Sequence, residues 1–261
     1  SVDAGGVARV ALTDAASEVE PEVLGRMQRQ LLSSLRSAGI ADVAMMVGGL
    51  ELDVAASGVL PTTVEAWPLV LADEEVGYLT GGGLEALPGG IGQAIASTEP
   101  TAFTLGRSGD VAGVTLPDGS IGRVTAANGL VYVDDREGLI DPAIDTANYI
   151  WSVPEAEPGA VQAVAADGVV RTIAGAWPGA SAVSSMQVSR DGTRMVAVVT
   201  EAGSDWVVSA GIIRDQDRVP TELGVPHKLA LLDGSGFAAT WLDDATVGIL
   251  VRGETDVRVL T

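Results

Sequence analysis

The N-terminal part of the chain combines two hydrophobic periods. Between Val7 and Leu12 apolar and polar positions alternate so that one face is more apolar than the other, which predicts a strand. Apolar residues then recur at helical spacing from Leu24 to Leu35, after a Pro21 that suits the first turn of a helix. Within Asp42–Val54, two apolar runs flank Gly48-Gly49 and predict a hairpin. The expected order is strand, helix, strand, strand.

From about Pro61 the helical period disappears, and short apolar runs alternate with turns that contain Gly, Pro or Asp. Four segments share a pattern of strand, turn and strand, at 70–78, 104–114, 187–198 and 239–249. Copies spaced by about 40–50 residues in an all-β stretch are typical of propeller blades with four strands each. The sequence therefore predicts a mainly β chain, with a β-propeller of about four or five blades at 57–261 and a small α/β unit at 1–56. A β-sandwich is the alternative, since it also has short strands and frequent turns.

Composition supports a folded core and argues against several classes of protein. Hydrophobic residues make up 47% of the 261 residues, which is enough to build a core. The 15 Lys and Arg against 35 Asp and Glu give a net charge of −20, which argues against a nucleic-acid binder and against a polybasic membrane-surface protein. No stretch approaches the roughly 18 uninterrupted apolar residues of a membrane-spanning helix. Without cysteine, a disulfide, a thiolate zinc site and a Cys nucleophile are all excluded.

One histidine and one lysine restrict the chemistry further. His227 cannot form a multi-histidine metal site alone, and its place in a predicted loop gives no support for a Ser-His-Asp triad. Lys228 is not preceded by Gly, so there is no Walker A motif. The segment 81–86 matches G-x-G-x-x-A, but Pro88-Gly89-Gly90 follows at once and argues against the helix that would receive a pyrophosphate. We interpret 81–86 as a turn between strands.

Acidic pairs and tryptophans are the remaining candidates for chemistry. Three carboxylate groups could form a general acid/base pair or a calcium site: Asp134-Asp135 with Glu137, Asp215 with Asp217, and Asp243-Asp244. Neighbouring aspartates at hairpin turns more often serve turn geometry and solvation. Packing between blades explains the five tryptophans more simply than sugar stacking does; they are Trp67, Trp151, Trp177, Trp206 and Trp241. We expect no catalytic, cofactor-binding or metal-binding residues, and the sequence does not indicate which residues bind a partner.

Several stretches resemble known families. Leu12-Thr13, the helical segment 28–35 and the segment 41–49 together resemble the second half of a GerMN domain. The stretch from Leu139 to Pro154, together with 188–194, is similar to the propeller of the actinobacterial LpqB lipoproteins. The two resemblances occur in the same order as in that family and together span most of the chain.

The LpqB resemblance implies a lipoprotein that is anchored by an N-terminal lipid to the outer face of the cell membrane. It implies an accessory protein that binds the extracytoplasmic domain of the sensor kinase MtrB of the MtrA–MtrB two-component system, in envelope homeostasis and cell division. It implies no catalytic residues and no cofactor. The lipobox Cys is absent from this sequence, and we expect a GerMN-like unit truncated at its N-terminus and a propeller truncated at its C-terminus.

Two functions from different classes remain open. The first is a non-enzymatic protein-binding module whose acidic surface favours a partner with basic patches. The net charge is −4 over 1–56 and −16 over 57–261, so the propeller is the expected binding side. The second is a glycan-binding or glycan-active propeller that acts on cell-envelope polymers. The second function requires at least three of the named Asp and Trp residues to converge in one concave pocket.

Overall fold

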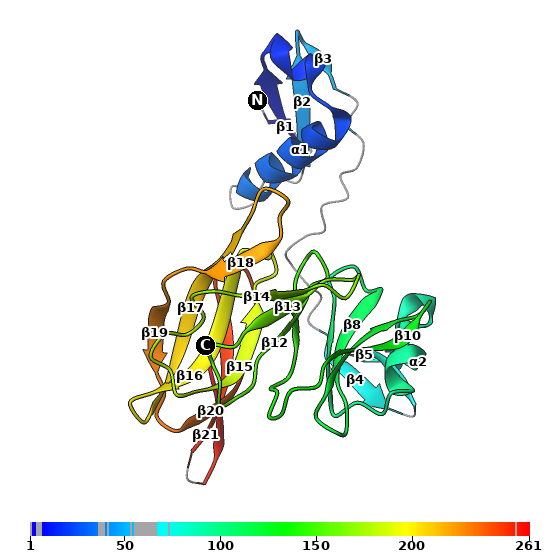
Figure 1. Ribbon diagram of the computed structural model, residues 1–261. Coiled ribbons are helices and arrows are strands. Elements are labelled where there is room, and N and C mark those ends of the chain that lie inside the picture. Colours follow the sequence, from blue (N-terminus) through cyan, green and yellow to red (C-terminus); the bar gives the residue numbers. More distant parts are fainter. Residues whose placement is uncertain are drawn as a thin grey trace. The chain divides into compact units, whose positions relative to one another are not determined.

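The computed structural model divides into two compact units, Ser1–Pro61 and Thr62–Thr261. It describes residues 2–3, 7–35, 40, 42–52, 54, 67–72, 74–253 and 255–261. The predicted boundary between residues 56 and 57 lies outside the described residues. Over the described residues, the first unit contains a 3-10 helix, an α-helix and three strands, and strands dominate the second unit (Figure 1).

The first unit is a three-stranded sheet with one long helix. β1 (Val7–Leu12) pairs in parallel with β2 (Asp42–Val47), and β2 pairs antiparallel with β3 (Leu50–Glu51). The connection from β1 to β2 contains a 3-10 helix (Asp14–Glu18) and α1 (Pro21–Leu35). The predicted order of strand, helix, strand and strand is confirmed.

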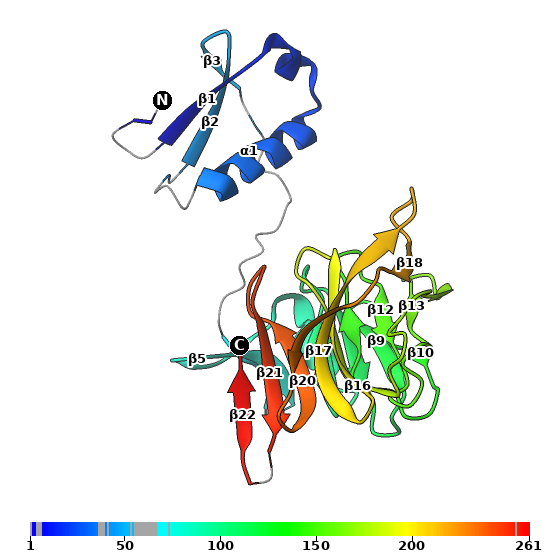
Figure 2. The ribbon, with the colours of Figure 1, turned by 90° about the vertical axis from the view of Figure 1, so that its left-hand side faces the viewer.

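The helix α1 lies against this small sheet (Figure 2). Leu24 of α1 and Val43 and Met45 of β2 are buried in one cluster. The Gln28 Nε2 atom also donates a hydrogen bond of 2.7 Å to the Val43 carbonyl oxygen. The apolar spacing along α1 therefore places its buried face on β2, as expected for an amphipathic helix.

Over its described residues, the second unit consists of five sheets, here numbered I to V in chain order. Sheet I contains β4 (Leu69–Ala72), β5 (Glu75–Thr80) and β6 (Gly83–Ala86). Sheet II contains β7 (Ala102–Leu105), β8 (Val111–Thr115), β9 (Ile121–Thr125) and β10 (Gly129–Asp134). Sheet III contains β11 (Ala143–Ile144), β12 (Ile150–Ser152), β13 (Gln162–Val164) and β14 (Val170–Thr172). Sheet IV contains β15 (Ala182–Val188), β16 (Arg194–Glu201), β17 (Ser204–Arg214), β18 (Pro220–Leu223) and β19 (His227–Leu231), and sheet V contains β20 (Ser235–Trp241), β21 (Val247–Arg252) and β22 (Val257–Leu260).

These sheets are the blades of a partial propeller. The first strands of sheets II to V begin at residues 102, 143, 182 and 235, which is a repeat of about 40–50 residues. The first strands are neighbours in space, because β11 contacts β7 and β15, and β15 contacts β20. The four predicted strand–turn–strand copies are the hairpins β4–β5, β7–β8, β15–β16 and β20–β21. The mainly β propeller prediction is confirmed, the sandwich alternative is wrong, and the described part of the unit forms no closed ring.

Apolar clusters join successive blades. One cluster joins sheets I and II and includes Val76 and Val114. A second joins sheets III and IV and contains the fully buried Trp151 with Met195. A third joins sheets IV and V around Trp241. Each sheet buries apolar surface against a neighbour, which is how a propeller builds a core from modules that cannot fold alone.

A helix after Pro88-Gly89-Gly90 contradicts the prediction that this part of the chain contains no helix. α2 (Ile91–Ala96) buries Ile91 and Ile95, which lie one turn apart, in the cluster of sheets I and II. Gly92 permits close packing on β5, since a Cβ atom there would meet the Val76 carbonyl oxygen at 2.3 Å. Burial of two isoleucines thus stabilises a helix that is too short to show a period in the sequence. The interpretation of 81–86 as a turn between strands is only partly right: residues 81–82 form the turn, whereas residues 83–86 form β6, which pairs with β5.

His227 lies in a strand and not in the predicted loop. It begins β19, an additional strand that pairs with β17 and places His227 opposite Ser209. β17 is 11 residues long and pairs with β19 along one part and with β18 along another. Both His227 and Lys228 are exposed on this outer strand. None of the described helices has the length and apolar character needed to cross a bilayer.

Candidate functional site

The turns between the first and second strands of sheets II to V contact one another; we call them the turn cluster. They comprise residues 106–110, 145–149, 189–193 and 242–246. Each contains an aspartate whose carboxylate accepts hydrogen bonds inside its own turn. Asp110 accepts from the Ser108 hydroxyl, and Asp191 accepts from the Thr193 amide. Asp145 accepts from the Ala147 and Tyr149 amides. Asp243 accepts from the Ala245 and Thr246 amides. The repeated aspartate therefore shapes these turns.

Glycine lets two of these turns pack closely on the turn of sheet III. Gly192 has a φ of +74°, and a Cβ atom there would meet the Thr146 Oγ1 atom at 2.5 Å. Gly106 leaves room for the Asn148 side chain, which an added Cβ would approach to 3.1 Å. The turns of sheets II and IV therefore both touch the turn of sheet III.

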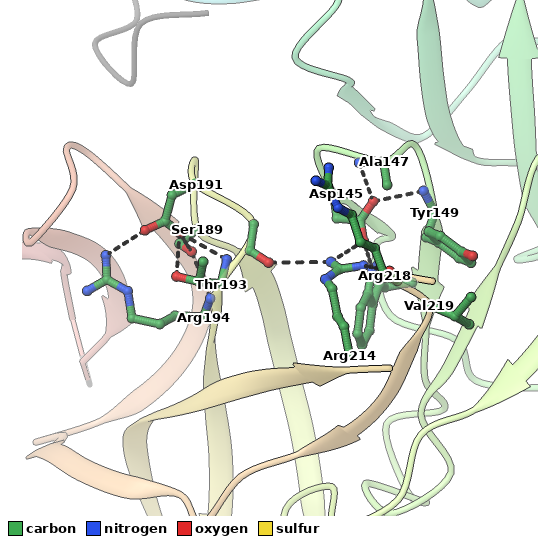
Figure 3. A network of polar contacts seen from close by, with 12 residues as sticks. Asp145, Ala147, Tyr149, Ser189, Asp191, Thr193, Arg194, Arg214, Arg218 and Val219 are labelled. Atoms are coloured by element: carbon green, nitrogen blue, oxygen red, sulfur yellow. Dashed lines mark hydrogen bonds and ion pairs between the residues drawn. The ribbon is translucent and has the colours of Figure 1, made fainter. Parts of the chain in front are cut away.

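The central polar contact of the turn cluster is a buried ion pair between Asp145 and Arg214 (Figure 3). The Asp145 side chain is 0% exposed, and its Oδ2 atom accepts from Arg214 Nη2 at 2.6 Å and from Trp151 Nε1 at 3.2 Å. Arg214, at the end of β17, also donates to the main-chain oxygens of Gly192 and Arg218. Both Asp145 oxygens and both terminal nitrogens of Arg214 have hydrogen-bond partners, which offset the cost of burying the two charges where sheets III and IV meet.

Asp191 forms the second part of the network in Figure 3. Its carboxylate accepts from the Ser189 hydroxyl at 2.5 Å and from the amide and hydroxyl of Thr193, and it pairs with Arg194 at 3.6 Å. Burial would raise the pKa of Asp191, but the hydrogen bonds from Ser189 and Thr193 hold the pKa below its usual value. The Arg194 guanidinium also lies 4.9 Å from the centre of the Trp241 ring and donates to the Asp244 carbonyl oxygen at 2.5 Å. Sheet IV is thereby joined to sheet V.

Three further arginines connect sheets through main-chain oxygens. Arg107 of sheet II donates to the Arg190 carbonyl oxygen at 2.7 Å, and Arg190 of sheet IV donates to the Trp241 carbonyl oxygen at 3.2 Å. Arg123 of β9 is buried and donates to the Asn148 and Val164 carbonyl oxygens of sheet III. Burial lowers the pKa of Arg123, and the nearby Asp145 carboxylate opposes that shift. These arginines are structural cross-links between blades.

Asp134, a candidate acid/base residue, is instead the acceptor of another structural contact. Its side chain is 3% exposed, and it accepts from Arg136 Nη2 at 2.7 Å and from the Ser152 hydroxyl at 2.6 Å. Arg136 also donates to the Ala160 carbonyl oxygen, so the group ties sheet II to sheet III. Burial would raise the pKa of Asp134, but the bonds from Arg136 and Ser152 hold the pKa below its usual value.

The other predicted candidates do not converge. The three carboxylate groups lie in separate turns, and Asp215 accepts from the amides of Asp217 and Val219 within its own turn. Trp151, Trp177 and Trp241 are buried in the clusters between blades, which confirms packing as their role, whereas Trp67 is exposed. Among the described residues, no three His, Asp or Glu side chains are placed to hold a metal ion. The surface concavity beside Asp134 and Asp135 is lined by none of the five tryptophans.

We expect acid to destabilise the second unit through these aspartates. Asp134 and Asp191 have folded-state pKa values below the usual 3.8. Their contribution is complete above 3.8 and is lost as the pH falls through the lowered values, because the unfolded chain binds the protons more tightly. Urea denaturation from about pH 5 to about pH 2.5, followed by tryptophan fluorescence, measures this loss. Asp134→Asn, a variant that cannot titrate at this position, should lose less stability over the same interval, and an equal loss in both proteins would contradict the assignment.

Repeated antiparallel sheets of three to five strands, with neighbouring first strands and turns cross-linked by arginine, define this unit as a β-propeller module. Residues 74–260 match the family model described as the lipoprotein LpqB beta-propeller domain. The chain therefore belongs to the LpqB propeller family.

Two solved structures match the chain over more than half of its length. A chain of the nidogen/laminin complex crystal structure is 14% identical, with a TM-score of 0.46, and the match covers 74% of this chain and 68% of that one. The beta-propeller domain of Cps50 (Swd1) from Myceliophteria thermophila is 9% identical, with a TM-score of 0.24, and the match covers 62% of this chain and 86% of that one. At these values neither structure carries an argument about function. No curated protein matches the chain.

Proposed function

We propose that the second unit is a non-enzymatic, protein-binding module of an extracytoplasmic lipoprotein. Its partner is the extracytoplasmic domain of an MtrB-type sensor kinase, and its role is accessory, in envelope homeostasis and cell division. Membership of the LpqB propeller family supports the lipoprotein context. The proposal places the protein at the outer face of the cell membrane, held there by a lipid anchor.

The observation that carries this proposal is that most basic side chains of the second unit form hydrogen bonds between its sheets. Residues 57–261 contain 27 acidic and 11 basic residues. Six of the basic residues donate hydrogen bonds from one sheet to another: Arg107, Arg123, Arg136, Arg190, Arg194 and Arg214. Because these arginines are bonded within the propeller, acidic side chains dominate the charged groups that remain for contact with a partner. Such a surface attracts a basic partner and orients it during encounter.

Binding of the full chain to the purified extracytoplasmic domain of the kinase, titrated at low and high salt, tests this function. We expect specific binding whose affinity falls by about tenfold or more between about 0.05 M and 0.5 M salt, since exposed charges are screened. Lysine-acetylated kinase domain is the control, because acetylation removes the positive charge of each lysine. No binding, or binding that is insensitive to both salt and acetylation, would overturn the proposal.

A further inference from the structure

Two exposed residues with large apolar side chains, Val131 and Tyr132, lie on the outer edge strand of sheet II and point to a specific contact site. β10 is the outermost strand of this sheet, and its outer edge pairs with no other described strand. Val131 and Tyr132 of β10 have exposed fractions of 51% and 65%. A large aromatic residue this exposed on an edge strand indicates a contact with a partner, because edge strands are normally short, charged or covered.

Tyr132 borders a concavity of about 530 Å³. The residues that line the concavity are Asp118, Ser120, Tyr132, Val133, Asp134 and Asp135. The register between β9 and β10 shifts between Tyr132 and Asp134, so Val133 forms a bulge at this place. A bulge re-aims the side chains around it and interrupts strand pairing, and therefore favours a side-chain pocket over the addition of another strand.

The charges of the concavity are fixed in position. Asp118 accepts from the amide and the hydroxyl of Ser120, at 3.0 and 2.6 Å, and these bonds lower the pKa of Asp118. Asp134 is held by Arg136 and Ser152, so its negative charge is matched inside the protein. Asp135 is exposed beside it. Asp118 and Asp135 are thus two carboxylates facing solvent next to an aromatic ring.

From this arrangement we infer that the concavity receives an arginine or lysine side chain of the protein partner; the inference rests on the proposed function. A cation gains from the face of the Tyr132 ring and from ion pairs with Asp118 and Asp135. Arginine suits the site better than lysine, since its planar guanidinium both stacks on an aromatic ring and donates in two directions to carboxylates.

The same chemistry disfavours a sugar as the occupant. Carboxylates only accept hydrogen bonds, and the Ser120 hydroxyl already donates to Asp118. A guanidinium or ammonium group offers only donors and matches these acceptors, whereas sugar hydroxyls need donors from the protein as well. A neutral sugar can donate hydrogen bonds to the two aspartates, but it gains no ion pair with them, whereas a cation gains both.

An NMR titration of the full chain with Nα-acetyl-arginine methylamide tests the pocket without the kinase. The matched control ligand is the citrulline analogue, which has the same shape and no charge. We expect the arginine ligand to shift the amide signals of residues 118–120 and 131–135, the citrulline ligand to leave them in place, and the response to be lost in Tyr132→Ala. No shift with arginine, or equal shifts with citrulline or with a chitin trisaccharide, would overturn the inference.

Kinase binding supplies the second measurement. Tyr132→Ala should weaken binding of the kinase domain by about tenfold or more, and Tyr132→Phe should retain most of the affinity. Asp118→Asn should weaken binding and reduce its salt dependence, while Asp217→Asn, the same charge change in the turn after β17, should change neither. Because Tyr132 is exposed, these variants are expected to fold.

The two readouts separate the possible failures. Arginine binding at the pocket together with no kinase binding would remove the proposed function and leave the pocket. Kinase binding that is unchanged in Tyr132→Ala would overturn the inference and leave the proposed function.

Discussion

Replacing Asp145 with alanine should lower the free energy of unfolding of the second unit by about 3–5 kcal/mol. The carboxylate is fully buried and accepts from Arg214, Trp151 and the amides of its own turn. Its removal leaves a mostly buried guanidinium without its anion, and it removes the acceptor of a buried indole N–H group. Loss of one partner of a buried pair is far more costly than loss of the pair, because the remaining charge stays desolvated.

Urea denaturation measures this cost in the second unit specifically, since all five tryptophans lie between residues 67 and 241 and report on that unit. Asp217→Ala, in an exposed turn, is the control and should change stability by less than about 0.5 kcal/mol. The double variant Asp145→Ala with Arg214→Met should be less destabilised than the sum of the two single variants. Additive losses would show that the two side chains act independently and would contradict the assignment.

Replacing Trp241 with alanine should cost a similar amount, about 3–5 kcal/mol, at a different interface. The ring is buried between sheets IV and V, lies under the Arg194 guanidinium, and donates from Nε1 to the Gln187 carbonyl oxygen at 3.3 Å. Alanine leaves a cavity in this cluster and removes both contacts. Sheet V packs on the propeller through this cluster, so it should loosen more than sheets II and III.

Hydrogen exchange followed by mass spectrometry locates the Trp241→Ala effect. The amides of β20 and β21 should exchange faster, while those of β8 and β9 keep their protection. Trp67→Ala, the same substitution at an exposed tryptophan, is the matched control and should leave both regions unchanged. Uniform loss of protection across all sheets would mean that Trp241 stabilises the unit as a whole and not the joint with sheet V.

Local signals in the sequence were enough to predict most of the architecture. The alternation before Pro21 and the helical spacing after it correspond to β1 and α1, and the turns marked by Asp or Gly correspond to real hairpins. Such features depend on neighbours within a few residues, and each is visible as a period or as a turn residue. Trp151, Trp177 and Trp241 were also predictable as packing residues, because a buried aromatic ring needs only an apolar neighbour, whereas the exposure of Trp67 was not predicted.

Elements that depend on distant neighbours were not predictable. α2 contains only two buried isoleucines. β19 depends on pairing with β17, and β18 lies between the two strands in the chain. The bonds from arginines to carbonyl oxygens of another sheet span from 24 residues, for Arg136 and Ala160, to 83 residues, for Arg107 and Arg190. A main-chain oxygen carries no sequence signature, so nothing in the chain indicates which arginine will reach it. The exposed position of Tyr132 was likewise invisible, since an aromatic residue in a strand usually faces a core.

Because the acceptors are main-chain oxygens, the propeller tolerates mutation at the acceptor positions better than at the arginine donor positions. Every residue type has a carbonyl oxygen, so positions such as 160 and 244 can vary in side chain without losing the hydrogen bond that their carbonyl oxygen accepts. No other residue type reproduces the length and the several donors of arginine, so each donor position has no substitute. During evolution, the side chains of the acceptor loops can therefore change while the same few arginines continue to join the blades.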